Sequence, residues 1–388
     1  MLLKFLAAIA ALLAFNATAQ AQPITPPPIA ARAYFLLDVL SGQTLAAASE
    51  DDRFEPASLT KLMTAYVVFS AIRDGKLQAT QQIAVSARAA KQGGARMFIG
   101  AGQSIAASDL LRGMIVQSAN DATVALAEAT AGSEDAFVAL MNAQAARLGL
   151  TQTHYVNATG MPAPEHYASA RDVGQLAAAL IRDFPDYHAL YAQKEFTFNR
   201  ITQTNRNRLL WIDPAVDGMK TGFTEAAGYC LVASAHRGER RLVAVVMGAQ
   251  SDTLRTSETE KLLNFGFQAY EARRLYRKGE PVAHPVIYKG TKPEAALGFD
   301  RDIWLTLPRE RFAGLAAVLE TRQPFVAPLA AGQKAGIMRI MRDQVPVAEF
   351  PVVALEDVPV AGFLSRGWDT LRLLVKPAEP ARISGVKP

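Results

Sequence analysis

Three short motifs in this chain of 388 residues could together perform nucleophilic chemistry. They are Ser58-Leu59-Thr60-Lys61, Ser118-Ala119-Asn120 and Lys220-Thr221-Gly222. A serine hydroxyl is a poor nucleophile unless a neighbouring base takes its proton. A spacing of three residues on a helix places Lys61 on the same face as Ser58. The first motif therefore predicts a serine nucleophile with a lysine as its base.

Lysine acts as a base only when it is neutral, so the pKa of Lys61 must fall from about 10.4 toward 7. A second cation about 6 Å away disfavours the charged form by about 2.8 kcal/mol at an effective dielectric constant of about 20. Lys220 is the candidate cation, and burial of Lys61 is expected to supply the remainder. The backbone N–H of Ser58, at a helix start, is a candidate donor to an oxyanion hole.

The second and third motifs supply groups that such a nucleophile needs. Ser118 can bond to both lysines and relay a proton to a leaving amine, and Asn120 can donate to a substrate carbonyl and orient Lys61. Gly222 lets a substrate backbone approach a strand edge, and Thr221 can bind a terminal carboxylate. Alone, each motif also fits a turn or an amphipathic helix with a surface lysine. Their joint occurrence favours a catalytic site.

Composition argues against several other classes of protein. A single cysteine, Cys230, excludes an intramolecular disulfide framework and a multi-cysteine zinc site. The five histidines are scattered and form no His-Glu-x-x-His motif, and no Gly-x-Ser-x-Gly motif occurs, so neither a metal centre nor a Ser-His-Asp hydrolase has support. The net charge of +5 comes without a basic cluster, so no nucleic-acid partner is expected.

The N-terminus has the features of an export signal. Lys4 precedes the apolar run Phe5 to Phe15, and Ala17-Thr18-Ala19 and Ala19-Gln20-Ala21 both offer small residues for cleavage. The apolar run is too short to cross about 30 Å of hydrocarbon, which disfavours a membrane anchor. Residues 1–21 are therefore predicted to be a secretory signal peptide.

Periodicity divides the mature chain into segments of different character. Strand-like runs form one predicted hairpin over 33–39 and 44–47 and another over 229–235 and 241–247. These runs, at both ends of residues 22–274, enclose a helical middle, which indicates an α/β (α+β) domain with helices on both faces of one antiparallel sheet. Within that middle, Ser108-Asp109 is a candidate cap for a helix over 110–117. Short alternating runs predict a small all-β domain over 275–361. An amphipathic helix over 362–376 and a disordered tail over 377–388 complete the chain.

The motifs and their flanks resemble the low-molecular-mass penicillin-binding proteins, the serine-type D-alanyl-D-alanine carboxypeptidases. The similar segments are 56–64, 117–122, 196–199, 205–207, 216–222 and 227–229, and the resemblance covers roughly residues 30–376. It implies a β-lactamase/transpeptidase-like catalytic domain followed by a β-rich domain. By motif match, Ser58 would be the acylated nucleophile and Lys61 its base, and Ser118 and Asn120 would form the second catalytic motif. The substrate end would be held by Lys220, Thr221 and Gly222. The backbone N–H of Phe223 would belong to the oxyanion hole, and Arg255 would lie near a terminal carboxylate. It places Arg206 and Asp172 in structural positions or at the rim.

The resemblance further implies the reaction and its setting. Ser58 would remove the terminal D-alanine from peptidoglycan stem pentapeptides in the periplasm, without metal or cofactor, and β-lactams would acylate it. Three alternatives stay open: a D,D-endopeptidase acting on cross-linked peptidoglycan, a β-lactamase, and a wall-binding protein without activity. Glu195 and Asn199 fit the Glu-x-x-x-Asn pattern of a class A β-lactamase, but they follow Ser118 too distantly.

The helix over 362–376 has one apolar and one polar face. The apolar face carries Phe363, Leu364, Trp368, Leu371, Leu374 and Val375, and the polar face Arg366, Asp369, Thr370, Arg372 and Lys376. Fifteen residues extend about 22 Å, too short to span a bilayer but suited to its interface. The resemblance also implies peripheral contact with the outer face of the cytoplasmic membrane. The alternative is a helix docked on the β-rich domain.

Overall fold

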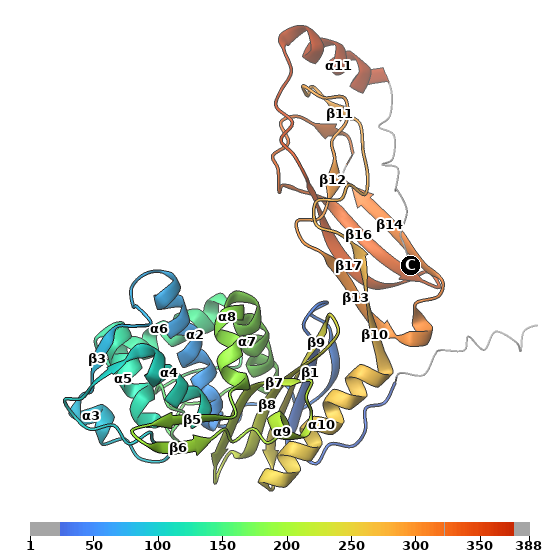
Figure 1. The fold of residues 1–388 in the computed structure, drawn as a ribbon. Helices are drawn as coiled ribbons and strands as arrows, with labels where there is room; N and C mark the ends of the chain where they lie inside the picture. Colours follow the sequence, from blue (N-terminus) through green and yellow to red (C-terminus); the bar gives the residue numbers. More distant parts are fainter. Residues whose placement is uncertain (1–23, 322, 376–388) are drawn as a thin grey trace, which may run out of the picture.

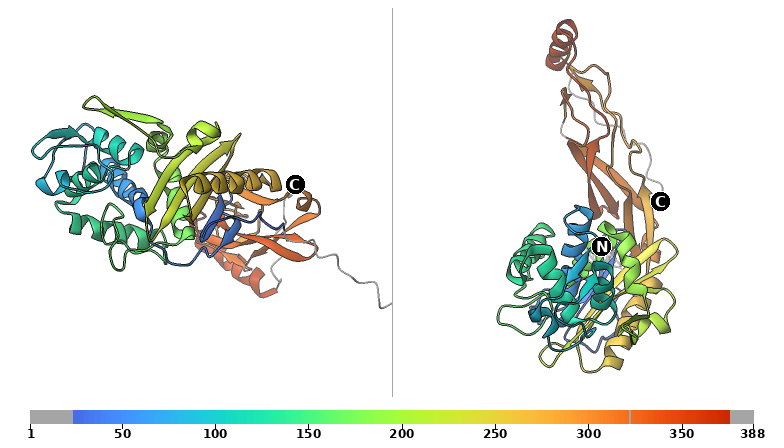
Figure 2. Two further views of the ribbon diagram at one scale, coloured as in Figure 1. Left: turned by 90° about the horizontal axis from the view of Figure 1, so that it is seen from below. Right: turned by 60° about the vertical axis from the view of Figure 1, so that its left-hand side comes forward.

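A computed structural model describes residues 24–321 and 323–375 (Figure 1). The predicted signal peptide, 1–21, and the predicted tail, 377–388, lie outside these residues. The chain forms a helix-rich part built around one sheet and an elongated β-rich part that projects away from it (Figures 1 and 2). A short helix lies at the far tip of the β-rich part.

A five-stranded antiparallel sheet forms the centre of the first part, with strand order β2-β1-β9-β8-β7. Its strands are β1 (Ala33–Asp38), β2 (Thr44–Ala48), β7 (Val216–Thr224), β8 (Gly228–Arg237) and β9 (Arg240–Ala249). The N-terminal strand β1 pairs with β9 along its whole length, so the two ends of the domain close one sheet. The predicted hairpins β1-β2 and β8-β9 are both confirmed. β7 lies at an edge of the sheet.

Helices cover both faces of this sheet, as the periodicity predicts. The helices are α2 (Lys61–Arg73), α3 (Ala87–Ala90), α4 (Ala107–Val116), α5 (Asn120–Ala131), α6 (Glu134–Arg147), α7 (Ala170–Asp183), α8 (Pro185–His188), α9 (Leu209–Ile212) and α10 (Asp252–Ala269), with 3-10 turns η1 (Ala57–Thr60) and η2 (Ala189–Ala192). Two small hairpins join them, β3 (Gln82–Ala84) with β4 (Ser104–Ala106), and β5 (Glu195–Phe198) with β6 (Ile201–Thr204).

The predicted cap of α4 is wrong. β4 continues directly into the helix, so α4 begins at Ala107 with Ala106 in the cap position. Ser108 and Asp109 therefore lie inside its first turn. There Asp109 forms an ion pair with Arg112 at 2.9 Å.

Two glycines let helices approach opposite faces of β1. Phe35 and Leu36 are adjacent and buried, and their side chains belong to the cores on opposite faces of the sheet, as strand alternation requires. A Cβ atom on Gly174 of α7 would lie 2.6 Å from the Phe35 ring, and one on Gly266 of α10 would lie 2.8 Å from the Leu36 side chain. The sheet is thus held between two helices at distances that only glycine permits.

The β-rich part contains its own core. Its strands are β10 (Tyr270–Tyr276), β11 (Ile287–Tyr288), β12 (Leu297–Gly298), β13 (Ile303–Pro308), β14 (Leu315–Thr321), β15 (Phe325–Val326), β16 (Lys334–Arg342) and β17 (Val345–Ala354), with a 3-10 turn η3 (Arg309–Arg311). Four of them form a sheet in the order β12-β17-β16-β14, and β10 pairs with β13. Phe299, Leu305, Met338 and Val352 are buried in this core. The predicted boundary between residues 274 and 275 lies within β10.

Specific contacts join the two parts. The buried Thr306 of β13 donates its backbone N–H to Gln43 Oε1 at 2.6 Å and bonds to the Ser41 hydroxyl at 2.8 Å. Arg240 bonds to Asp38 at 2.8 Å and to the backbone oxygen of Tyr270 at 2.7 Å. The β1-β2 turn and the end of α10 therefore fix the start of the β-rich part.

The final helix, α11 (Phe363–Val375), lies next to β11 (Figure 1). No helix within residues 24–321 and 323–375 has the length and apolar content needed to cross a membrane.

We expect Gly174→Ala to destabilise the first part of the molecule. The added methyl group would contact the ring of the buried Phe35, and overpacking typically costs about 1–3 kcal/mol, which outweighs the helix propensity of about 1 kcal/mol gained. Calorimetry should show a melting midpoint lower by a few degrees. Gly367→Ala on α11, where nothing lies within 4 Å of the new methyl group, is the matched control. An unchanged midpoint for Gly174→Ala would contradict the packing argument.

Candidate active site

Ser58 and Lys61 are in contact, as their spacing predicts. Lys61 Nζ donates to Ser58 Oγ at 3.0 Å and to the backbone oxygen of Thr159 at 2.6 Å. The 3-10 turn η1 leads directly into α2, so the serine precedes the lysine by about one turn. Lys61 is only 1% exposed. A buried amine with the serine hydroxyl as one of its two partners is placed to exchange a proton with it.

Burial lowers the pKa of the Lys61 amine to about 7, and the positive charge of Arg206 is the second cause. Lys220, the cation expected to act on Lys61, is not among these causes, and the repulsion between the two lysines lowers the pKa of Lys220 instead. Lys220 is itself buried, and its pKa is lowered well below the usual value by burial and by the charges of Lys61, Arg206 and Arg255. Lys61 can therefore be neutral near pH 7, because it is buried away from water and lies among other cations.

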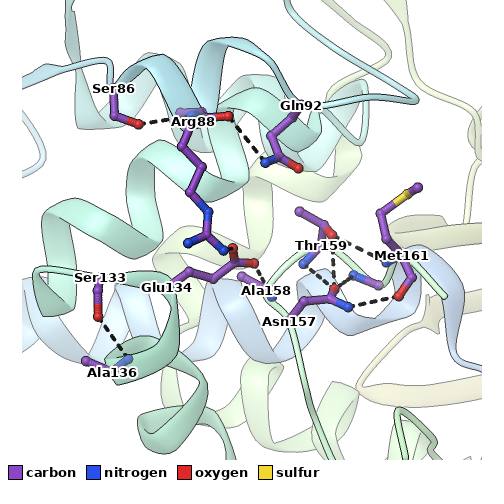
Figure 3. Close-up of polar contacts among 12 residues, drawn as sticks. Ser86, Arg88, Gln92, Ser133, Glu134, Ala136, Asn157, Ala158, Thr159 and Met161 are labelled. Carbon is purple, nitrogen blue, oxygen red and sulfur yellow. Dashed lines mark hydrogen bonds and ion pairs between the residues drawn. The ribbon is translucent and has the colours of Figure 1, made fainter. Parts of the chain in front are cut away.

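The second partner of Lys61, the Thr159 carbonyl, belongs to a loop that the sequence motifs do not include. Figure 3 shows the hydrogen bonds within this loop. Asn157 Oδ1 accepts from the backbone N–H groups of Thr159 and Gly160, at 3.1 and 2.7 Å, and its Nδ2 donates to the backbone oxygen of Met161 at 2.8 Å. Glu134 accepts from the N–H of Ala158 at 3.1 Å. These bonds fix the loop, and with it the Thr159 carbonyl that holds Lys61.

Gly160 allows this loop to lie against η1. Its φ is +84°, and a Cβ there would lie 1.8 Å from the backbone oxygen of Ala57. Thr60 Oγ1 also bonds to His166 Nε2 at 2.9 Å. Residues about 100 positions further along the chain therefore pack against η1, the turn that carries Ser58.

The second motif lies in the link between α4 and α5, and its predicted contacts with the lysines are not made. Asn120 Nδ2 donates to the backbone oxygen of Gly93 at 2.7 Å. Ser118 has a φ of +65°, which is unusual for a residue with a side chain. Within the described residues, the buried Ser118 Oγ and Asn120 Oδ1 have no hydrogen-bond partner. Both residues line the same cavity as Ser58, so these unpaired oxygens are available to a ligand.

The third motif lies on the edge strand β7, beside η1. Lys220 Nζ donates to the backbone oxygen of Thr221 at 2.9 Å. A Cβ on Gly222 would lie 3.1 Å from the backbone oxygen of Pro56 and 3.3 Å from the Ser58 nitrogen. The glycine thus allows the serine turn to pack on the strand, a reason that differs from the substrate approach expected from sequence. The Phe223 ring is half exposed and lies 4.4 Å from that of Tyr229.

Arg255 of α10 extends to Gly222 and Tyr229, beside the third motif. Its Nη1 donates to the backbone oxygen of Gly222 at 3.2 Å, its guanidinium forms an ion pair with Asp252, and it lies 5.4 Å from the centre of the Tyr229 ring. It is buried and lines the cavity, in keeping with the position that the resemblance implies.

Asp172 and Arg206 both fit the positions that the resemblance implies. The expectation of a structural or rim position fits Asp172, which is buried and accepts from Gln152 N at 2.7 Å and Thr153 Oγ1 at 2.8 Å. Arg206 is exposed and lines the cavity, which fits a rim position, and its charge lowers the pKa of both lysines. Its neighbour Asn207 anchors the segment by donating to the backbone oxygen of Gly218 at 2.9 Å. In the sequence, the polar triplet 205–207 is the feature that points to this part of the cavity.

These groups surround a single cavity of about 800 Å³. Besides Ser58, Ser118, Asn120, Thr221, Gly222, Phe223 and Arg255, its lining includes Thr159, Gly160, Met161, Arg206, Arg208, Trp211, Tyr229 and Asp252. Glu195, the residue of the β-lactamase-like pattern, is exposed on β5 and is not part of this lining. No cluster of three or more His, Cys, Asp or Glu side chains suited to a metal ion occurs in the described part of the chain. The cavity therefore combines an activated serine with arginines that can bind an anion.

Comparison with known proteins agrees with this geometry. A family model described as D-alanyl-D-alanine carboxypeptidase matches residues 17–251, and one described as the C-terminal domain of penicillin-binding protein 5 matches residues 270–360. The chain is 41% identical to the D-alanyl-D-alanine carboxypeptidase DacC of Escherichia coli over 95% of both chains. It is also 41% identical to DacA of that organism, over 90% of this chain and 88% of the other.

The fold shows the same similarity. The crystal structure of penicillin-binding protein 5 from Haemophilus influenzae has a TM-score of 0.83 and 39% sequence identity to this chain. The match covers 87% of this chain and 99% of the other, so it extends over the β-rich part.

Arg206→Gln should raise the pKa of Lys61 above about 7, because it removes the cation that disfavours the ammonium form. The value should stay below that of a free lysine, since Lys61 remains buried. Titration of ¹³C-labelled lysine side chains by NMR, with Lys61→Arg for assignment, would measure this. Arg208→Gln, two residues away, removes an equal charge that is not among the causes acting on Lys61. An equal rise in both variants would show that Arg206 has no particular influence.

Proposed function

The chain belongs to the D-alanyl-D-alanine carboxypeptidase family, and we propose that Ser58 and Lys61 are the nucleophile and base of its reaction. The protein is a serine-type D-alanyl-D-alanine carboxypeptidase of the penicillin-binding group. The observation that carries the proposal is the 3.0 Å contact between a serine hydroxyl and a buried lysine amine whose pKa is lowered to about 7. The substrate is a peptidoglycan stem peptide that ends in two D-alanines.

The acylation step follows from this contact. Neutral Lys61 takes the proton of Ser58 Oγ, which attacks the carbonyl carbon between the two D-alanines and forms an ester. The peptide C–N bond breaks, and the leaving amine takes up the proton that Lys61 accepted, while the unpaired Ser118 hydroxyl in the same cavity can bond to that amine. The backbone N–H groups of Ser58 and Phe223 are the oxyanion-hole donors in this proposal.

Deacylation uses the same base. Water attacks the Ser58 ester while Lys61 accepts its proton; the C–O bond to Ser58 then breaks, and Lys61 returns the proton to Ser58 Oγ, which regenerates the hydroxyl and frees the shortened peptide. A β-lactam presents a strained amide to Ser58 and would acylate it in the same way.

The arginines and Thr221 account for the preference for a chain end. The terminal carboxylate of D-alanine would bind near Thr221 and Arg255, at the end of the cavity where Arg206 adds a second guanidinium. Guanidinium groups bind carboxylates by charge-assisted hydrogen bonds. Arg255 is buried, so a peptide end without a carboxylate would leave its substrate-facing donors without a charged partner.

Ser58→Ala should abolish the release of D-alanine from a stem pentapeptide and the labelling of the protein by fluorescent penicillin, because it removes the atom that forms the ester. In the wild-type protein the rate of labelling should rise with pH through about 7 and then level off, since Lys61 is a base only when deprotonated. Ser70→Ala, on the same helix α2, is the matched control and should retain both activities. Labelling that persists in Ser58→Ala would contradict the proposal.

We further propose that α11 attaches the protein to the outer face of the cytoplasmic membrane after export. Its apolar residues Phe363, Leu364, Trp368 and Leu371 are 82%, 86%, 64% and 56% exposed. Asp369, on the polar side, accepts from the backbone N–H of Lys289 at 2.6 Å. The helix thus contacts the β-rich part through its polar side, which disfavours the alternative of an apolar docking face.

The position of α11 suits this role. It lies at the end of the β-rich part farthest from the catalytic sheet (Figure 1). A protein held there would direct its active site away from the bilayer and toward the wall. The β-rich part would then act as a spacer.

A chain truncated after Val360 should no longer float with vesicles of phosphatidylethanolamine and phosphatidylglycerol, whereas the full mature chain should. The reason is the loss of the exposed apolar face, since an interfacial helix binds in proportion to the apolar area it buries. Val345→Ser removes a valine that is 61% exposed on β17 and should leave flotation unchanged. Equal flotation of truncated and full chains would rule out the anchor.

A further inference from the structure

We propose that Asp252 is a positioning residue for Arg255, and that it thereby sets the preference of the cavity for a substrate with a free terminal carboxylate. The inference rests on the proposed function, because it concerns the same reaction. Neither the sequence motifs nor the family resemblance pointed to Asp252.

Asp252 connects two arginines at the mouth of the cavity. Its Oδ1 forms an ion pair with Nη2 of Arg255, and its Oδ2 lies 2.7 Å from Nε of Arg208. Arg208 is 62% exposed in its side chain, whereas that of Arg255 is 7% exposed. The carboxylate is therefore held from the solvent side by Arg208 and in turn holds the buried guanidinium of Arg255.

Apart from Asp252, few contacts fix the orientation of the Arg255 guanidinium group. Nη1 donates to the backbone oxygens of Gly222 at 3.2 Å and Cys230 at 3.5 Å, and within the described residues the buried Nε has no hydrogen-bond partner. The second of these distances is long for a hydrogen bond. Among the described residues, Asp252 is thus the acidic group that pairs with the Arg255 guanidinium, beside the place where we propose that a carboxylate binds.

The charges of the cavity lining also support a positioning role for Asp252. Asp252 is the one acidic residue in the cavity lining, which also holds Arg206, Arg208 and Arg255. Burial lowers the pKa of Arg255, and Asp252 opposes this by raising it. Without Asp252, Arg255 would lie among cations with no anion to orient it before the substrate arrives.

A purely structural role for Asp252 is the competing explanation. Asp252 lies in the first turn of α10, where the helix dipole favours an acidic residue, but the helix is already capped by Ser251, whose Oγ accepts from Leu254 N at 3.1 Å. The same arrangement occurs in α4, where Asp109 in the first turn pairs with Arg112 three residues later. That pair is exposed and is not part of the cavity lining, so Asp109 provides a matched control.

The experiment compares two thioester substrates in which thioglycolate replaces the terminal D-alanine of an acyl-D-alanyl chain. One carries the free carboxylate and the other its methyl ester, and both are reactive enough for turnover to be measured. Asp252→Asn should lower kcat/KM for the free acid by about 10-fold or more, mainly through KM, and leave the methyl ester nearly unchanged. Asp252→Glu should recover part of the loss, and Asp109→Asn should change neither substrate.

An equal loss for both thioesters in Asp252→Asn would overturn the proposal, because it would indicate a general structural effect. No loss for either would also overturn it. Failure of the proposed function is separate: it would appear as wild-type turnover that Ser58→Ala does not abolish. The ratio between the two thioesters is therefore informative only about Asp252, and the Ser58→Ala comparison only about the nucleophile.

Discussion

The site depends on one physical condition, which is that an amine must lose its water without losing its hydrogen bonds. Lys61 is fully enclosed, yet its nitrogen donates to the Ser58 hydroxyl and to the Thr159 carbonyl. Desolvation disfavours the ammonium form and brings its pKa into the range where it can act as a base. Three features keep the Lys61 amine buried and in place. They are the loop held by Asn157, the close approach at Gly160 and the tight packing of η1.

Packing between the sheet edge and the helical part creates the rest of the site. Gly222 lets β7 lie against the serine turn, and Gly160 lets the Thr159 loop lie beneath it. The strand that would pair with an extended substrate is thereby fixed relative to the nucleophile. Precise catalytic geometry here comes from backbone segments that approach more closely than any side chain would allow.

The cavity balances several cations against one acid. Arg206 and Arg255 favour an anionic ligand in the cavity, while burial and the charge of Arg206 lower the pKa of both lysines. In the proposed mechanism, the charge of Arg206 thus both favours the neutral form of the base and attracts the terminal carboxylate of the substrate. At the junction of the two parts, Thr306 and Arg240 bond the start of the β-rich part to the catalytic domain.

The sequence by itself determined what depends on local spacing. The pairing of Ser58 with Lys61, the hairpins β1-β2 and β8-β9, the helix-covered sheet and the amphipathic α11 all follow from periods of two, three or four residues along the chain. Only the tertiary structure decided which distant groups complete the site. Thr159 is 98 residues from Lys61, Gly93 is 27 from Asn120, and Arg206 reaches both lysines from a short polar segment. No local pattern encodes such contacts, because they arise from how the edge strand, the serine turn and the intervening loops pack together.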